Sequence, residues 1–424
     1  MPGCSVPVRA APTAQGQVIV TVNGPGEVSA WLWPLTHALR AAAPDLRLHA
    51  CLLPCVFSSG AEATVAEGLG TLDGVSPVRE SMALIRRNAL PPGLRRDVPT
   101  LVFHLGGEVA LTRAIAWRMR APIWAYAESP IGGRAFERVY FSGLNPLPAR
   151  LADPARLVGD LMVDAAALRR SLAPPRGPGA PRMLGLFPGS RDYAVRPLLP
   201  HYAWFVNRLA ADDPGLTFAM AKADFIPEAL LRDIPPPPEG RPWPADPVRY
   251  RSAGGASWLE TGAGVRIDIL SNRAVLTRAD VALTIPGTNT GEIAAAGIPM
   301  VVIAPLYLSE QVPLPGLAGH LGRIPRLGPA IKRAVLRRQL AGMPFLALPN
   351  RRAGRMIVPE FVGNDLHDGV EAALRRLLGE AGEDTRAALR EAMGPAGAGA
   401  RLAADIAARF AIGVSAQSTG TVRA

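Results

Sequence analysis

Residues 184 to 191 read Leu184-Gly-Leu-Phe-Pro-Gly-Ser-Arg191, an apolar strand pattern that runs into a proline and glycine turn. A helical pattern follows over residues 198–209. A strand, a glycine turn and a helix in this order form the repeating unit of a doubly wound α/β sheet. This stretch therefore predicts a Rossmann-like domain in the second half of the chain.

The turn itself carries groups that suit a phosphate. Gly189 lets backbone amides approach phosphate oxygens, Ser190 adds a hydroxyl donor, and Arg191 supplies a planar charged fork. We expect a diphosphate to bind here without a metal ion. Proline, glycine and serine also make ordinary turns, so the prediction needs support from the rest of the chain.

The strand and helix alternation extends over most of the sequence. In the first half, strands are expected at 17–22, 46–53, 100–105 and 122–125, and helices at 29–43 and 109–120. In the second half, strands are expected at 183–187, 217–221, 265–269, 281–284 and 300–303, and helices at 198–209 and 290–296. Between them, residues 172–182 are rich in proline and glycine, which predicts a linker. We expect an α/β protein with two mainly parallel, Rossmann-like domains that face a cleft, at 1–172 and 182–379, followed by helices at 380–424.

A second motif follows the strand expected at 281–284, in Val281-Ala-Leu-Thr-Ile-Pro-Gly-Thr-Asn-Thr-Gly-Glu292. Gly287, Thr288 and Asn289 offer amide and hydroxyl donors at a carboxyl end of the sheet, where ligands bind in such folds. Glu292 has a carboxylate that can accept hydrogen bonds from two ribose hydroxyls. The alternative for Glu292 is that it simply favours the positive end of a helix.

Three segments together resemble the lipid-A-disaccharide synthases, in the order found in that family. They are 187–200 with the phosphate turn, 287–302 with Gly287-Thr288 and Glu292, and 348–360 with Leu348-Pro349-Asn350, Ala353-Gly354-Arg355 and Val358-Pro359-Glu360. The resemblance implies a GT-B architecture with the acceptor domain first, and a C-terminal helix that crosses back to it. It also implies a hexosyltransferase reaction, in which an acylated glucosamine moves from UDP to an acylated glucosamine 1-phosphate with inversion and without a metal or other cofactor.

The resemblance also implies roles for single residues on the donor side. Gly189, Ser190 and Arg191 would contact the diphosphate of the UDP-sugar, and Thr288 and Glu292 its nucleotide. Asn350 and Arg355 would contact the donor sugar or phosphate. For Arg355 the alternative is a structural ion pair, with Glu360 as the candidate partner.

The acceptor side departs from the family pattern. Gly26-Glu27-Val28-Ser29 resembles the start of a family turn, but Ala30 and Trp31 replace its final glycine and aspartate. A transferase needs a base for the acceptor hydroxyl. The candidates are Glu108, which follows the strand at 100–105, then Glu27, and then His104, whose imidazole titrates near neutral pH. For each, the alternative is a cap or loop hydrogen bond.

Composition limits the class of protein and its location. A net charge of +11 fits a surface that faces phosphates, although an arginine-rich chain can also reflect genome composition. Three cysteines make no disulfide framework or zinc site, and no apolar run reaches the ~20 residues that span a bilayer. We expect a cytoplasmic protein without a secretory signal, which acts on a UDP-sugar and a lipid or amphipathic acceptor and binds no nucleic acid. The basic segment 321–342 suggests contact with an anionic membrane at the inner face, with a solvated helix as the favoured alternative.

Other classes of protein share parts of these features. A UDP-sugar epimerase would have the same architecture, and a binding protein that has lost its base would keep the donor site. A dinucleotide oxidoreductase is disfavoured, because Gly24-Pro25-Gly26 lacks the third glycine of that fingerprint.

Overall fold

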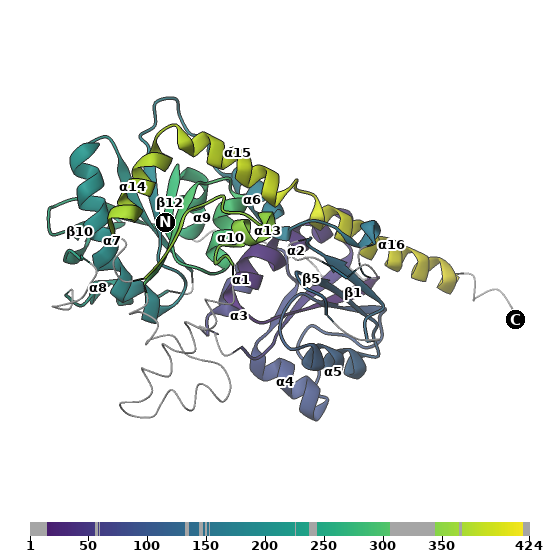
Figure 1. Cartoon of the computed structure of the whole chain (residues 1–424). Coiled ribbons are helices and arrows are strands. Elements are labelled where there is room, and N and C mark those ends of the chain that lie inside the picture. Colours follow the sequence, from purple (N-terminus) through teal and green to yellow (C-terminus); the bar gives the residue numbers. More distant parts are fainter. Residues whose placement is uncertain are drawn as a thin grey trace, which may run out of the picture.

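A computed structural model describes residues 15–305 and 344–418, apart from short gaps at 56–57, 59, 132–134, 144–146, 149–150, 152, 225, 237–243 and 364–366. Within this part, the chain forms two lobes, each built on a sheet (Figure 1). The basic segment 321–342 lies outside the described residues, as does the middle of the proline-rich segment 234–247.

The first lobe holds a sheet of six described strands in the order β3-β2-β1-β4-β5-β6, all of them parallel. Its strands are β1 (Gly16–Val22), β2 (Leu46–Leu52), β3 (Gly74–Ser76), β4 (Thr100–His104), β5 (Ile123–Ala127) and β6 (Arg138–Phe141). Its helices are α1 (Pro25–Glu27), α2 (Trp33–Ala42), α3 (Glu62–Glu67), α4 (Val78–Arg87), α5 (Val109–Met119) and α6 (Leu161–Leu172). A π-helical turn, Val28–Leu32, joins α1 to α2.

The second lobe holds a sheet of eight described strands in the order β14-β13-β12-β7-β8-β11-β10-β9. Its strands are β7 (Met183–Phe187), β8 (Thr217–Lys222), β9 (Val248–Ala253), β10 (Ala256–Thr261), β11 (Arg266–Ser271), β12 (Val281–Thr284), β13 (Met300–Pro305) and β14 (Glu360–Gly363). Its helices are α7 (Asp192–Asp212), α8 (Ala229–Arg232), α9 (Asn272–Arg278), α10 (Thr288–Ala295), α13 (Leu348–Ala353), α14 (His367–Leu378) and α15 (Ala381–Met393). The pairings β9–β10 and β10–β11 are antiparallel and the other pairings of this described sheet are parallel, so the expectation of two mainly parallel, Rossmann-like domains is confirmed.

The last helix, α16 (Ala398–Ser418), returns to the first lobe. In Figure 1, α15 lies along the second lobe, and α16 continues from it across the first. Leu402, Ile406 and Phe410 of α16 are buried in the same apolar cluster as α2 and the first sheet. Asp164 of α6 accepts hydrogen bonds from the backbone amides of Gly397 and Gly399, which fixes the start of α16.

A separate apolar cluster joins the lobes. Met162, Val163 and Ala166 of α6 are buried together with Ala30 of the first lobe and with side chains of β7, β12 and α10. Since α6 also buries Leu161 against the first sheet, this helix packs on both lobes.

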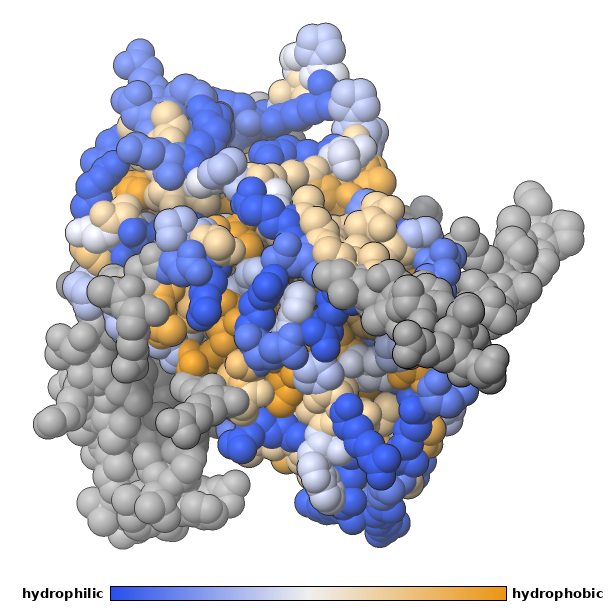
Figure 2. All heavy atoms as spheres, turned by 90° about the vertical axis from the view of Figure 1, so that its right-hand side faces the viewer, coloured by the Kyte–Doolittle hydropathy of each residue, from blue (hydrophilic) through white to orange (hydrophobic). Residues whose placement is uncertain are grey.

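The outer surface has no large group of described apolar side chains from one element. The large apolar residues that are exposed among the described ones, Leu90, Trp117, Leu157, Leu172, Met356 and Val362, come from separate parts of the chain. Figure 2 shows hydrophilic and apolar side chains interspersed over one face of the molecule. No described helix is both long and apolar enough to cross a membrane.

Candidate functional site

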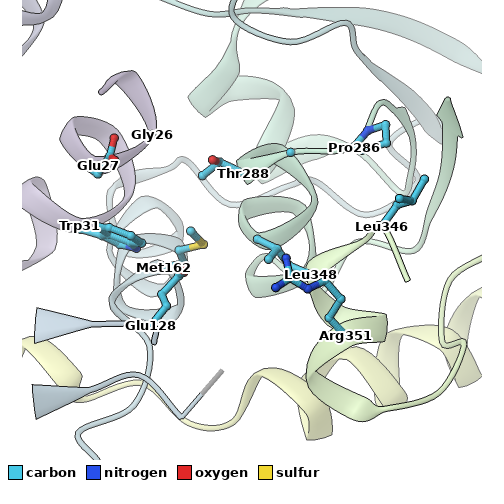
Figure 3. A pocket seen from close by; sticks show the side chains of 11 residues that line it. Gly26, Glu27, Trp31, Glu128, Met162, Pro286, Thr288, Leu346, Leu348 and Arg351 are labelled. Atoms are coloured by element: carbon cyan, nitrogen blue, oxygen red, sulfur yellow. The ribbon is translucent and has the colours of Figure 1, made fainter. Parts of the chain in front are cut away.

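A cavity of about 470 Å³ lies between the two lobes. The first lobe lines it with Gly26, Glu27, Trp31, Glu128 and Met162. The second lobe lines it with Pro286, Gly287, Thr288, Leu346, Leu348 and Arg351. Figure 3 shows these two sets of side chains facing one another, with Glu27 across from Thr288 at one end and Glu128 across from Arg351 at the other. Most of these residues follow the carboxyl end of a parallel strand, which is where such sheets bind ligands.

The first-lobe wall is shaped by the turn after β1. Pro25 begins α1, a position where its missing N–H costs no hydrogen bond, and Glu27 ends it. The π-helical turn that follows contains Trp31, which lines the cavity and packs its ring edge-on against Tyr126 with centroids 5.9 Å apart. Such turns frequently occur at functional sites.

Glu27 is the only one of the three predicted base candidates that lines the described cavity. Burial raises the pKa of its carboxyl, whereas the backbone amides of Glu27 and Gly24 and the charge of Arg191 lower it. Gly106 and Gly24 pack against this side chain so closely that a β-carbon on either would contact it. Glu27 is therefore held in place beside the turn that the sequence predicts to bind phosphate.

The other two base candidates lie elsewhere. His104 is buried and its Nδ1 is 2.8 Å from Oγ1 of Thr112, which in turn contacts Thr21. Burial lowers the pKa of His104 to about 4. Glu108 is exposed at the N-cap of α5 and is not among the residues lining the cavity. His104 thus packs into the β4–α5 core, and Glu108 stands at the N-cap position of α5 without a side-chain capping hydrogen bond. That either residue acts as the base stays a prediction.

Glu128, which the sequence analysis missed, is the second carboxylate of the cavity. It directly follows β5. Burial raises its pKa to about 7, with further upward contributions from Asp160 and Glu27 and opposing ones from Arg351 and Arg352. The rule that singled out Glu108, a carboxylate just after a parallel strand, would also have found Glu128.

The predicted phosphate turn leads directly into a helix. Gly189 has a φ of 97°, a left-handed conformation that glycine adopts without strain, and α7 starts at Asp192, one residue after Arg191. Because β7 and β12 are neighbours and parallel, this turn lies beside residues 285–288 at the start of α10. Two helix N-termini thus meet at one sheet edge, where free backbone N–H groups favour an anion. That Gly189, Ser190 and Arg191 bind a diphosphate stays a prediction.

The Gly287-Thr288-Asn289 turn brings the two lobes into contact. Gly287 and Thr288 are exposed in the cavity wall, and Asn289 is half-buried. A β-carbon on Gly26 would lie 3.0 Å from Cγ2 of Thr288, so glycine at position 26 permits this close approach. The predicted nucleotide contacts of these residues remain predictions.

Glu292 forms an ion pair that joins the two lobes. Its Oε1 accepts a hydrogen bond from Nη2 of Arg169 at 2.6 Å, and both side chains are 5% exposed. Arg169 also donates to the carbonyl of Ser29 at 3.3 Å. Glu292 thus has a structural partner, which the sequence did not reveal, and its contact with the ribose is still untested.

Asn350 and Arg355 do not face the cavity. Asn350 is fully buried, and its amide bonds to the backbone of Ile357 and Val358 and to Oε1 of Glu360. Its own loop therefore uses the amide, and the predicted contact of Asn350 with the donor sugar stays a prediction. Arg355 is exposed, and Glu360 instead accepts from the amides of Leu346 and Ala347, each at 2.8 Å.

The neighbours of Asn350 reach the cleft in its place. Arg351 lines the cavity. Arg352 donates to Oδ2 of Asp160 at 2.9 Å and to the carbonyl of Ser142 at 3.3 Å, both in the first lobe. Asp160 is 2% exposed and also caps α6 through the amide of Met162. The third resembling segment therefore contributes its arginines to the interface.

No protein-family model matches the chain. Among curated proteins, a lipid-A-disaccharide synthase of Cupriavidus pinatubonensis is 25% identical over 314 residues, which cover 70% of this chain and 66% of that protein. A lipid-A-disaccharide synthase of Granulibacter bethesdensis is 24% identical over 355 residues, which cover 77% of each chain.

Solved structures match the chain over nearly its whole length. One, assigned as a UDP-N-acetylglucosamine 2-epimerase from Listeria monocytogenes, has a TM-score of 0.50 at 12% identity and covers 97% of this chain and 99% of its own. The S. aureus MnaA structure with UDP has a TM-score of 0.51 at 11% identity and covers 94% of this chain and 97% of its own. At this identity the likeness concerns the fold alone. The fold, two Rossmann-like domains facing a cleft, is of the GT-B type, as expected from the sequence.

Proposed function

We propose that this chain, a divergent relative of the lipid-A-disaccharide synthases, is a glycosyltransferase that moves a glucosamine-type sugar from a UDP donor to a lipid or other amphipathic sugar acceptor. The observation that carries the proposal is the cavity between the lobes, with carboxylates on its first-lobe wall and glycine, hydroxyl and arginine groups on its second-lobe wall. A transferase needs this division, because one side must take up a proton while the other holds a departing diphosphate.

The donor would bind to the second lobe. The turn at Gly189-Ser190-Arg191 and the start of α10 at Thr288 lie side by side and offer backbone amides, hydroxyls and one guanidinium. As the bond between the sugar and UDP breaks, negative charge develops on the leaving oxygen, and these groups would stabilise it without a metal.

The acceptor would enter from the first lobe. Its hydroxyl oxygen attacks the anomeric carbon on the side opposite to the leaving UDP, which inverts the configuration, and its proton passes to a carboxylate. Glu27 and Glu128 are the two carboxylates that line the described cavity. Because an acylated acceptor partitions into a bilayer, we expect the reaction at the cytoplasmic face of the membrane.

A thermal-shift measurement tests the donor half of the proposal. UDP at about 100 times its Kd should stabilise the protein by about 2.7 kcal/mol, and UDP-N-acetylglucosamine should act in the same direction. Arg191→Ala should abolish the shift, because it removes the guanidinium of the phosphate turn. Arg278→Ala, which removes an exposed arginine elsewhere on the second lobe, is the matched control. No shift with either ligand would refute the donor assignment.

Mass spectrometry of the products tests the transfer itself. Incubation with UDP-2,3-diacylglucosamine and its 1-phosphate counterpart should yield a disaccharide and UDP. Release of free sugar or UDP from UDP-N-acetylglucosamine alone would instead identify an epimerase. Tight UDP binding with no turnover of any kind would identify a binding protein that has lost catalysis.

A further inference from the structure

We propose that Glu128 is the catalytic base that takes the proton from the acceptor hydroxyl, an inference that rests on the proposed sugar transfer. The family resemblance does not point to this position, and neither does any of the three sequence candidates. The assignment comes from the place of Glu128 in the cavity and from the charges around it.

Glu128 stands on the wall that an inverting transfer requires. It follows the carboxyl end of β5 in the first lobe, whereas the phosphate turn and the start of α10 belong to the second lobe. An attacking hydroxyl must approach the sugar from the side opposite to the diphosphate, so its base must belong to the opposite wall. In Figure 3, Glu128 and Met162 lie on that wall, across the cavity from Leu348 and Arg351.

The surroundings of Glu128 tune it for proton uptake near neutral pH. Burial, Asp160 at the start of α6 and Glu27 of α1 raise its pKa to about 7, while Arg351 and Arg352 of α13 act in the opposite direction. A base works best when its pKa lies near the working pH, because it is then both deprotonated and strongly basic. An ordinary exposed glutamate would be deprotonated too, but it would be a far weaker base.

Glu27 is less suited to this role. Burial raises the pKa of Glu27, but the backbone amides of Gly24 and of Glu27 itself and the charge of Arg191 stabilise its charged form and oppose that rise. A carboxylate held in this way is a poorer proton acceptor. We assign Glu27 as a positioning residue that orients Arg191 toward the donor.

The transfer forms one bond at the anomeric carbon and breaks another. A lone pair of the acceptor hydroxyl oxygen forms the new bond to the anomeric carbon, and the bond from that carbon to the diphosphate oxygen breaks, with its electron pair leaving on UDP. The hydroxyl proton moves to the carboxylate of Glu128. Glu128 then returns this proton to water, and the enzyme is regenerated.

The test compares Glu128→Gln and Glu27→Gln in the full chain, with Glu67→Gln, an exposed glutamate of α3, as control. Glu128→Gln should lower kcat for disaccharide formation by about 10²–10⁴-fold and leave the Kd for UDP within about twofold. In the unaltered chain, kcat should rise about tenfold per pH unit below pH 7 and level off above it. The residual activity of Glu128→Gln should lack this rise.

Glu27→Gln should behave differently. It should keep the rise of kcat with pH and weaken UDP binding, since the charge of Glu27 no longer acts on Arg191. Glu67→Gln should match the unaltered chain in both measurements.

Three results would overturn the assignment of Glu128. The first is a Glu128→Gln variant that transfers sugar within about threefold of the unaltered rate. The second is a pH rise that persists in that variant, and the third is a loss of transfer fully explained by a loss of UDP binding. In these cases the unaltered chain still transfers sugar, so the proposed function survives. If the unaltered chain binds UDP but forms no disaccharide, both proposals fail together.

Discussion

The side-chain amide of Asn350 makes all of its described hydrogen bonds within its own loop. Its Oδ1 accepts from the amides of Ile357 and Val358 at 2.6 and 2.9 Å. Its Nδ2 donates to the carbonyl of Val358 and to Glu360, each at 2.7 Å. These bonds hold the segment between α13 and β14, so Asn350 supports the position of Arg351.

Asn350→Ala should therefore reduce stability more than donor binding. It removes one hydrogen bond from Glu360, which keeps those from Leu346 and Ala347, and it takes the side-chain partner from the carbonyl of Val358 and from the amides of Ile357 and Val358. We expect this loss to cost about 2–4 kcal/mol of unfolding free energy. Urea denaturation measures this cost. Arg355→Ala, at an exposed position nearby, should change the free energy by less than about 0.5 kcal/mol. A stable Asn350→Ala variant whose melting temperature no longer rises with UDP would instead show that Asn350 contributes directly to donor binding.

The sequence identified some site residues and missed others for a physical reason. Glu27 was found because it stands in the glycine turn after a clear strand, and Thr288 because it follows β12. Whether a carboxylate faces solvent, a core or a cavity depends on what packs over it. Glu128 and Glu108 both follow parallel strands, but of the two only Glu128 lines the described cavity, where Arg351 of the opposite lobe forms part of the other wall.

The strands of both sheets were largely predictable, and the helix starts were less so. β7 and β12 were predicted at the residues where they occur, because short apolar runs bounded by turns define buried parallel strands. α7 was expected from residue 198 but starts at Asp192, and it contains Pro197 and Pro200. Buried Val195, Leu198 and Leu199 hold the helix through these prolines, so tertiary packing outweighs the local preference.

The antiparallel hairpin of β9 and β10 was not predicted. It extends the second sheet beyond β11. Several of its residues, including Arg249, Arg251 and Ser252, are polar and exposed, so apolar and polar residues do not alternate clearly along it. Edge strands of this kind carry charged side chains, which discourages pairing with other chains. The alternation of apolar and polar residues in this hairpin is therefore too weak to predict its strands from the sequence.

The junction between α14 and α15 depends on a close backbone approach. A β-carbon on Gly382 would lie 2.3 Å from the carbonyl oxygen of Leu377, a backbone atom that cannot rotate away. Gly382→Ala should therefore shift the last turn of α14 and lower the unfolding free energy by about 1–3 kcal/mol in urea denaturation. Gly177→Ala, in the linker with no neighbour within 4 Å, is the control. Equal stability of the two variants would mean that the junction adjusts without cost.

At the scale of the whole molecule, charged contacts tie the lobes together around the cavity. Arg169 pairs with Glu292 on one side, and Arg352 pairs with Asp160 on the other. All four side chains are largely buried, and burial of charges is tolerated only when they are paired. Sequence analysis could not find these pairs, because their members lie more than 100 residues apart.

Arg169→Ala should be strongly destabilising, because it leaves Glu292 charged and buried without its partner. We expect a loss of about 3–5 kcal/mol, measured by urea denaturation. Arg170→Ala, an exposed neighbour on α6, should be close to neutral. The double variant Arg169→Met with Glu292→Leu should recover most of the loss. If Arg169→Ala is as stable as Arg170→Ala, the pair contributes nothing to the joining of the lobes.

The return of the chain through α16 also affects how the two lobes are held together. The polypeptide passes from the first lobe to the second after α6, and back again between α15 and α16. A chain that crosses twice ties each lobe to the other at both ends of its fold, so the two walls of the cavity are kept in register by covalent structure as well as by the contacts between them.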